Sequence, residues 1–253
     1  MLQACGVTDK NRLRKTNEDC FAVDVAHGLC VVADGMGGHN AGEIAAQMAV
    51  DAVLEFGKPD ASSVANWPLG YDDTLSPTGN RLRTAIHLAN LQILEYSNDL
   101  AACSGMGTTI VAAIVIGNQL SVGYVGDSRL YVASSRGLKR LTVDDSWMTL
   151  MLTDDPGLDA ASLRHHPLRN ALTSAVGTRA RTTVHIIEET LGDGELLLLS
   201  TDGVHGVLDD VQIDRLLRGC WDVGDGARRL VDAALSAGSR DDCTAIVARY
   251  LPD

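Results

Sequence analysis

Four aspartates stand at the borders of apolar runs, and this placement restricts the fold more than any other feature of the sequence. Asp34 follows LCVVA, Asp127 follows LSVGYVG, Asp202 follows LLLLST, and Asp241 stands just before DCTAIVARY. Short runs rich in Val, Ile, Leu and Tyr, bounded by Gly, Asp or Asn, predict buried strands. We therefore expect packed sheets that carry carboxylates at their strand ends, where the backbone is rigid.

Six segments of the chain are predicted to be buried strands. The step from Gly117 to Asn118 lies between two apolar runs and predicts a tight hairpin turn. The glycine after Asp34, like the one after Asp202, is expected to let the chain turn sharply with its own carbonyl exposed. The six segments are residues 29–33, 108–116, 120–125, 130–133, 195–200 and 243–250.

Two helices are predicted from apolar residues that repeat at helical spacing. The first covers residues 41–56, with Asn40 as N-cap and Glu43 in its first turn. Its expected buried positions are Ile44, Met48, Ala52 and Phe56. The second covers about residues 80–98, and its expected inward positions are Leu82, Ile86, Ala89, Ile93 and Tyr96.

The order of these elements predicts an α+β fold. Strands come before, between and after the helices, and two consecutive antiparallel hairpins lie in the middle, so regular βαβ alternation is not expected. A length of 253 residues with 45% hydrophobic residues is enough to bury a sizeable core. We expect one domain over residues 1–253.

The charge and cysteine content restrict the partners and the compartment. Asp and Glu outnumber Lys and Arg by 33 to 21, a formal net charge of -12, which disfavours nucleic acid and anionic membranes. The six cysteines form no C-x-x-C pair, and free thiols are expected. Without a signal-like or membrane-spanning apolar stretch, the sequence predicts a cytoplasmic protein.

Carboxylates gathered at strand ends would define a site for hard cations. Taken singly, an Asp-Gly step is an ordinary turn. If several converge, like charges raise one another's pKa unless a cation neutralises them. Carboxylate, carbonyl and water oxygens suit magnesium or manganese, and such water-rich sites favour hydrolysis.

Eight strings, in order, resemble the metal-dependent protein phosphatases of the PPM class, the type 2C Ser/Thr phosphatases, and bacterial members in particular. They are RLRKTNED, VVADGMGGHNAGE, GMGTT, GYVGDSRLY, DDSW, HHPLRNALTSAVG, LLLLSTDG and SRDDCTAIV. The resemblance covers about residues 7–250. It implies a four-layer sandwich, with two central antiparallel sheets flanked by helices on both outer faces and a metal centre at one end.

The resemblance also assigns ligands for two manganese or magnesium ions. It implies that Asp34 bridges both ions and that Gly35 supplies a carbonyl. A third, weaker ion is implied for bacterial members. The remaining implied ligands are Glu18 and Asp19 through bound waters, Asp202 and Asp241 on the other metal, and Asp127 with Asp202 on the third.

The implied reaction is direct attack of a metal-bridging water on a Ser/Thr phosphate ester, without a phosphoenzyme. Arg14 matches the family's phosphate-binding arginine, and its planar fork suits two phosphoryl oxygens. Read without the family, Arg14 is a surface residue of a basic segment, because Arg12 and Lys15 stand beside it.

Two positions depart from part of the family. Met36 follows the Asp-Gly step where eukaryotic-type members place a proposed general acid, and His39 stands three residues later. His39 is a candidate proton donor, beside two alternatives, a helix cap or a metal-bound water in that role. Asp242 stands where the family usually has Asn, and its carboxylate either tightens cation binding or faces solvent.

Residues 141–177 match the family's flap, which influences substrate choice. His165, His166 and Pro167 lie in it, and we assign them packing and surface roles. A cysteine phosphatase built on Cys243 and Arg249 is disfavoured, because TAIVA between them predicts a strand rather than a phosphate loop. The glycine-rich strings GMGGHNAG and GMGTT lack nucleotide-binding spacing.

An inactive member of the fold that serves as a binding or regulatory module is the alternative function. Such members typically lose a metal-site carboxylate, whereas Asp34, Asp202 and Asp241 are all present. The expected partners are phosphorylated Ser/Thr proteins, including a separate Ser/Thr kinase and its targets. We expect a monomer that binds neither nucleic acid nor membrane.

Overall fold

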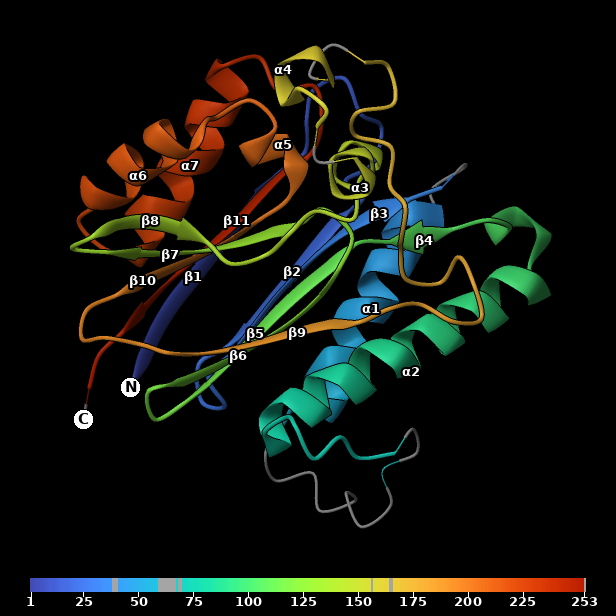
Figure 1. Cartoon of the computed structure of the whole chain (residues 1–253), viewed down its shortest axis with the longest axis horizontal. Helices are drawn as coiled ribbons and strands as arrows, with labels where there is room; N and C mark the ends of the chain where they lie inside the picture. Colours follow the sequence, from blue (N-terminus) through green and yellow to red (C-terminus); the bar gives the residue numbers. More distant parts are fainter. Residues whose placement is uncertain (38–40, 59–66, 68–69, 156, 164–165, 253) are drawn as a thin grey trace.

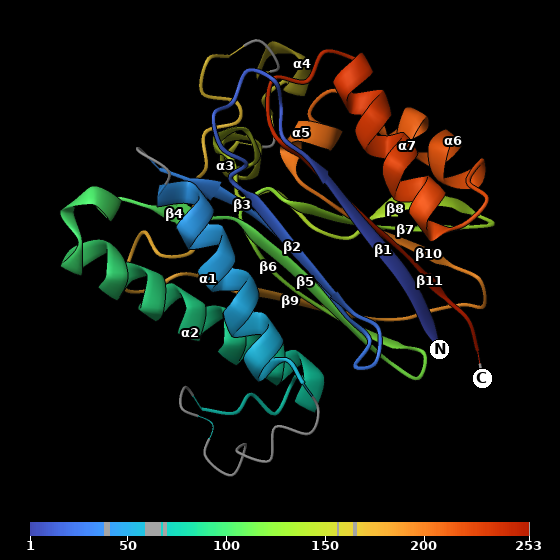
Figure 2. The ribbon, with the colours of Figure 1, turned by 180° about the vertical axis from the view of Figure 1, so that it is seen from behind.

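Two antiparallel sheets packed face to face form the centre of the structure, and helices cover both outer faces (Figures 1 and 2). The structure is a computed structural model that describes residues 1–37, 41–58, 67, 70–155, 157–163 and 166–252. Among these residues no helix has the length and apolar character needed to cross a membrane.

One sheet joins the two ends of the chain to its middle, and the other is built mainly from the first half. The first sheet has the order β1 (Leu2–Asp9), β11 (Cys243–Tyr250), β10 (Leu196–Ser200), β7 (Arg129–Ser134) and β8 (Gly137–Arg140). The second has the order β2 (Asp19–Asp24), β3 (Leu29–Met36), β5 (Ile110–Ile116), β6 (Gln119–Val125) and β9 (His185–Thr190), with β4 (Gly107–Thr108) paired to β3.

The helices form one pair on each outer face and a group of short helices near one end of the sandwich. The pair α1 (Ala41–Phe56) and α2 (Pro77–Asp99) covers the second sheet, and α6 (Asp210–Arg218) and α7 (Val223–Ser236) cover the first (Figure 1). The short helices are α3 (Trp147–Asp154), α4 (Ala160–Leu163) and α5 (Asp202–His205), and a 3₁₀ turn, η1 (Ala101–Cys103), follows α2.

Apolar side chains fill three layers, one between the sheets and one beneath each helix pair. Successive strand residues point to opposite faces, so Val31 packs under α1 and α2 while Val32 packs between the sheets. Leu198 likewise faces α6 and α7, and its neighbour Leu199 faces the other sheet. Burial on both faces explains why these strands are continuous apolar runs.

All six predicted strands are present, and the Gly117-Asn118 hairpin joins β5 to β6 with Gly117 at φ 58°. The α+β class is confirmed. The sequence did not predict β1, β2, β8, β9, α6 or α7. Strand β3 also runs past the predicted end through Asp34 and Gly35 to Met36.

The buried face of α1 agrees with the predicted one at Ala52 and differs from it at the larger residues. Its fully buried positions are small residues such as Ala45, Ala49 and Val53, whereas Ile44 and Met48 are only partly buried. Small side chains let the helix lie close to the sheet.

In α2 the inward positions are confirmed except Tyr96, which is 39% exposed and was wrongly predicted to face inward. The predicted N-cap of α1, Asn40, lies outside the described residues.

Candidate active site

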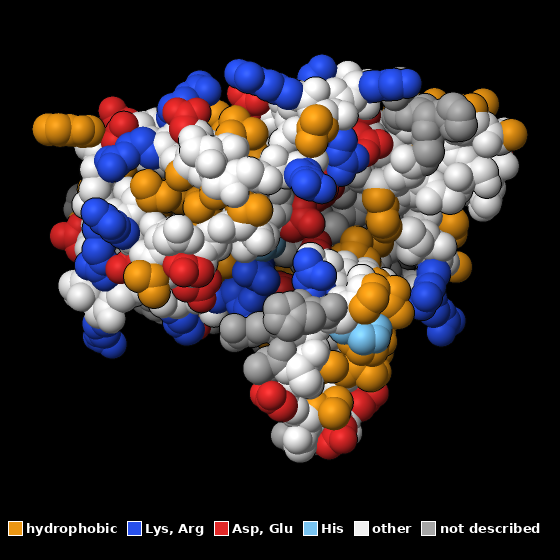
Figure 3. All heavy atoms as spheres, turned by 90° about the horizontal axis from the view of Figure 1, so that it is seen from above, with side chains coloured by type: hydrophobic (Ala, Val, Ile, Leu, Met, Phe, Trp, Pro, Cys, Tyr) orange, Lys and Arg blue, Asp and Glu red, His pale blue; other side chains and the backbone are white. Residues whose placement is uncertain are grey.

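The aspartates that border the apolar runs meet at one end of the sandwich. Asp34 lies near the end of β3, Asp127 lies where the chain crosses from β6 in one sheet to β7 in the other, and Asp202 opens α5 directly after β10. Asp241 precedes β11. All four line a cavity of about 280 Å³, together with Arg14, Glu18, Gly35, Asn170 and Leu172. Figure 3 looks onto this end and shows acidic side chains in a hollow, with Lys and Arg around it.

Burial and mutual repulsion raise the pKa values of these carboxylates. Burial raises the pKa of Asp34 well above its usual value, and the negative charges of Asp19, Asp202 and Asp241 act in the same direction. Burial and the nearby Asp202 raise the pKa of Asp127 to about 7. The cavity therefore favours either bound protons or bound cations.

The donor set fits divalent cations. Asp202 Oδ1 is buried and has no hydrogen-bond partner, which leaves one oxygen free to bind an ion. Among the described residues, no three acidic, His or Cys side chains already form a cage around one point. Instead, Arg14 donates to Glu18 at 3.1 Å and to Asp241, so a guanidinium supplies the counter-charge between them. Oxygen donors of this kind suit magnesium or manganese.

Asp242 holds the loop that carries Arg14 and Glu18. Its Oδ1 accepts the backbone N–H of Asn11 at 3.0 Å, and its Oδ2 accepts that of Glu18 at 2.9 Å. The side chain is buried, with Asp242 only 2% exposed. The interpretation that Asp242 faces solvent was therefore wrong, because its oxygens are buried and accept backbone amides. The alternative, that its charge tightens cation binding, stays a prediction.

Asp19 lies beneath the cavity, opposite Asp34 in the β2–β3 register. Its Oδ2 accepts hydrogen bonds from the hydroxyls of Thr201 at 2.9 Å and Thr244 at 2.6 Å. Sequence reasoning missed both threonines. The signal available was a buried hydroxyl residue in each of two apolar strings, LLLLST and CTAIV.

The glycines after Asp34 and Asp202 are required by close packing rather than by a turn. A Cβ on Gly35 would stand 2.0 Å from the carbonyl oxygen of Gly42, and one on Gly203 would stand 1.9 Å from that of Asp242. Neither glycine has a left-handed φ. The predicted sharp turn at these glycines was wrong, since Gly35 continues β3 and Gly203 lies in α5.

The predicted flap, residues 141–177, reaches the cavity, and hydrogen bonds of Asp145 hold its first residues in place. Asn170 and Leu172 line the cavity. Asp145 accepts the backbone N–H of Gly126 at 2.9 Å and lies 3.0 Å from His185 Nε2. Because the next residue is Asp127, the start of the flap is hydrogen-bonded to the backbone immediately before a site carboxylate.

Of the three histidines singled out from the sequence, only His166 lies within the described residues. The ring of His166 stacks on that of Trp147 with centroids 4.2 Å apart, in agreement with a packing role. His39 and His165 lie outside the described residues.

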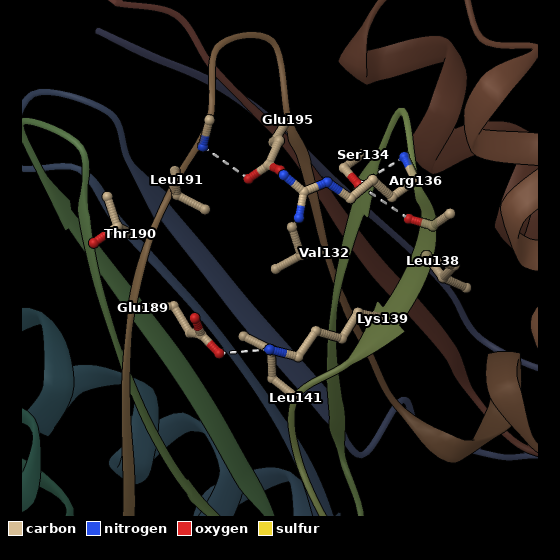
Figure 4. Close-up of a pocket in the computed structure, with 12 residues that line it drawn as sticks. Val132, Ser134, Arg136, Leu138, Lys139, Leu141, Glu189, Thr190, Leu191 and Glu195 are labelled. Carbon is tan, nitrogen blue, oxygen red and sulfur yellow. Dashed lines mark hydrogen bonds and ion pairs between the residues drawn. The ribbon is translucent and has the colours of Figure 1, made fainter.

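Neither Cys243 nor the cavity between β8 and β9 offers an alternative active site. Cys243 is buried in β11, and burial raises the pKa of its thiol to about 11, the opposite of a nucleophilic cysteine. A larger cavity of about 510 Å³ lies between the edge strands β8 and β9 (Figure 4). There Lys139 pairs with Glu189 at 2.6 Å, and Glu195 accepts the backbone N–H of Gly192.

An acid-lined cavity at the end of a helix-flanked double sheet is the architecture of a hydrolase that works with bound divalent cations. The family model for protein phosphatase 2C matches residues 11–237. The chain belongs to the protein phosphatase 2C family, as its sequence strings predicted.

Relatives of the chain agree with this assignment. A Ser/Thr phosphatase, stp, of Listeria welshimeri is 30% identical over 95% of this chain and 92% of its own length. The crystal structure of the Mycobacterium tuberculosis Ser/Thr phosphatase PstP/Ppp superposes with a TM-score of 0.85 at 28% identity, covering 100% of this chain and 99% of that one. A PstP catalytic domain solved with two manganese ions has a TM-score of 0.80 at 28% identity, covering 99% and 98%. The expected four-layer sandwich is confirmed.

Proposed function

We propose that this protein hydrolyses phosphoserine and phosphothreonine esters in proteins, with two manganese or magnesium ions bound in the acidic cavity. The observation that carries the proposal is the meeting of Asp34, Asp127, Asp202 and Asp241 around one cavity that Arg14 also lines. Family membership and the two manganese ions of a PstP structure support it.

The residues that would hold the ions are those given by the family register. Asp34 would serve both ions, and Gly35 would supply its carbonyl. Asp202 and Asp241 would complete the other ion, and Asp127 with Asp202 would hold a third. Glu18 and Asp19 would act through bound waters. When bound, the ions make a water molecule more acidic and offset charge on the phosphoryl oxygens.

The chain's own groups bind and orient the substrate. Arg14 lines the cavity, and its guanidinium N–H groups donate to the carboxylates of Glu18 and Asp241. When substrate binds, the same N–H groups would donate to phosphoryl oxygens instead. Leu172, from the flap, supplies an apolar part of the cavity wall. His39 remains the proposed proton donor to the leaving alkoxide, beside a metal-bound water.

The physiological substrates that we propose are a separate Ser/Thr kinase and the proteins it phosphorylates. The names of the relatives, which are Ser/Thr phosphatases, support phosphorylated proteins as the substrate class. We further propose that residues 1–253 act as one domain, with residues 141–177 as its flap.

Hydrolysis of p-nitrophenyl phosphate and of a phosphothreonine peptide, with and without manganese, tests the function. We expect metal-dependent turnover that D34N, D202N and D241N each reduce at least about 100-fold, with circular dichroism unchanged. The matched control D214N alters an exposed ion pair with Arg218 on α6 and should retain activity. No turnover with any divalent ion would favour the inactive binding module instead.

A further inference from the structure

A short turn beside the cavity concentrates positive charge in an acidic protein. Residues 10–15 read KNRLRK and contain four of the 21 Lys and Arg residues, in a chain with a net charge of -12. One of the four, Arg14, lines the cavity. Arg12, Leu13 and Lys15 are its neighbours in the turn, and Figure 3 shows Lys and Arg side chains around the hollow at this end of the molecule.

The turn is held rigidly. The backbone N–H of Arg14 donates to the carbonyl of Asn11 at 2.9 Å, and that of Leu13 donates to Asn11 Oδ1 at 3.0 Å. Asn11 is only 5% exposed, and its amide donates to the carbonyl of Ser239 at 2.6 Å. Together with the hydrogen bond to Asp242, these contacts fix the turn against the start of β11.

The outer side chains of the turn are not used by the fold. Arg12 and Lys15 are exposed, and neither forms an ion pair with another residue in the described part of the chain. Arg240, next to Ser239, is likewise exposed. Leu13, between the cations, is 74% exposed.

We propose that this basic turn, residues 10–15 with Arg240, recognises acidic residues beside the phosphorylated residue of a protein substrate. The inference rests on the proposed function, because it assumes that the phosphoryl group enters the cavity at Arg14. An extended peptide advances about 3.3–3.6 Å per residue, so the residues next to the phosphoresidue pass the turn. Opposite charges there favour the encounter and the register.

The α1 side of the cavity carries an acidic residue. Glu43 is exposed in the first turn of α1, and the preceding residue, Gly42, packs against the cavity-lining Gly35. Acidic residues on that side of the phosphoresidue would meet a like charge. The preference for acidic neighbours is therefore one-sided, stronger either before or after the phosphoresidue.

Four phosphothreonine peptides of equal length test this. Two carry Glu on one side only, before or after the phosphothreonine, one carries Gln on both sides and one carries Lys on both sides. For the wild-type protein with manganese at about 50 mM salt, we expect kcat/KM for one Glu peptide to exceed that for the Gln peptide by about three- to tenfold. The Lys peptide should be the poorest substrate. Raising the salt to about 500 mM should remove most of this difference.

The variant R12Q/K15Q should lose the preference and keep its kcat/KM for p-nitrophenyl phosphate, which has no flanking residues. The matched control R136Q/K139Q removes the same two charges from the far end of the β7–β8 hairpin (Figure 4) and should keep the preference. Equal kcat/KM for all peptides, or a preference that survives in R12Q/K15Q, would overturn this inference alone. A wild-type protein without p-nitrophenyl phosphate turnover would overturn the proposed function together with it.

Discussion

Asp242 accepts the backbone N–H of Glu18 at 2.9 Å, across 224 residues of sequence. The same carboxylate accepts the N–H of Asn11 at 3.0 Å, so it holds both ends of the loop that carries Arg14. Its neighbour Asp241 is the other partner of the Arg14 guanidinium. One end of β11 thus sets where the loop lies and what its arginine contacts.

D242N should reduce kcat/KM for a phosphopeptide by about tenfold, through a raised KM. Asparagine offers one acceptor oxygen, and its NH₂ group would face a backbone N–H, so one of the two anchors is lost at about 1–3 kcal/mol. Steady-state kinetics of D242N, R14A and the double variant measure the coupling. If Asp242 acts through Arg14, D242N has little further effect in R14A. Additive losses would show that it acts elsewhere.

R14A should raise KM for phosphate esters by about tenfold or more, with a smaller change in kcat, because a bidentate contact to the phosphoryl oxygens is lost. R14K should recover only part of this, since an ammonium is a point charge. R218A is the matched control, because Arg218 pairs with Asp214 on α6. An unchanged KM in R14A would contradict its role in binding phosphate.

Manganese should raise the Tm of the wild-type protein, and D202N should shrink that rise. Burial and Asp241 raise the pKa of Asp202, so its ionised form is disfavoured in the metal-free fold, which loses stability as pH rises through that pKa. D202N removes this penalty, and its metal-free Tm at pH 7.5 should therefore exceed that of the wild type. Calorimetry with and without manganese measures both effects. If manganese raised the Tm of D202N as much as that of the wild type, a ligand role for Asp202 would be contradicted.

The His185–Asp145 pair should make stability depend on pH. The hydrogen bond with Asp145 raises the pKa of His185 against the opposing effect of burial. The stabilisation is fully present below the unfolded pKa of about 6.5, and it is lost as pH rises through the higher folded value. H185Q should lower the Tm by no more than about 2 °C at pH 6. The Tm difference between the wild type and H185Q should be smaller at pH 8.5. An equal Tm difference at both pH values would contradict a stabilising role for the protonated His185.

The residues alone left the meeting of the site aspartates as a condition, and the family resemblance implied it for Asp34, Asp127, Asp202 and Asp241. The six predicted strands could be recognised because they are buried on both faces. Their apolar runs are continuous, and their borders are marked by Asp and Gly. The helix α2 was predictable for a similar reason, since large residues such as Ile86 and Ile93 form its buried stripe.

Features that depend on distant contacts could not be predicted. The role of Asp242 depends on two backbone amides that reach it from the other end of the chain. Asp19 depends on Thr201, which follows β10, and on Thr244 in β11, and both of these strands belong to the other sheet. The predicted buried face of α1 was confirmed only at Ala52, because close packing selects small residues over the larger Ile44 and Met48.

The 1.9 Å between a would-be Cβ of Gly203 and the carbonyl oxygen of Asp242 has a consequence for the spacing of the carboxylates. Gly203 follows Asp202, and Asp242 follows Asp241, so the two backbones that touch are those that carry a pair of cavity aspartates. Even one methyl group at position 203 would wedge these segments apart. The spacing between Asp202 and Asp241 therefore depends on position 203 having no side chain.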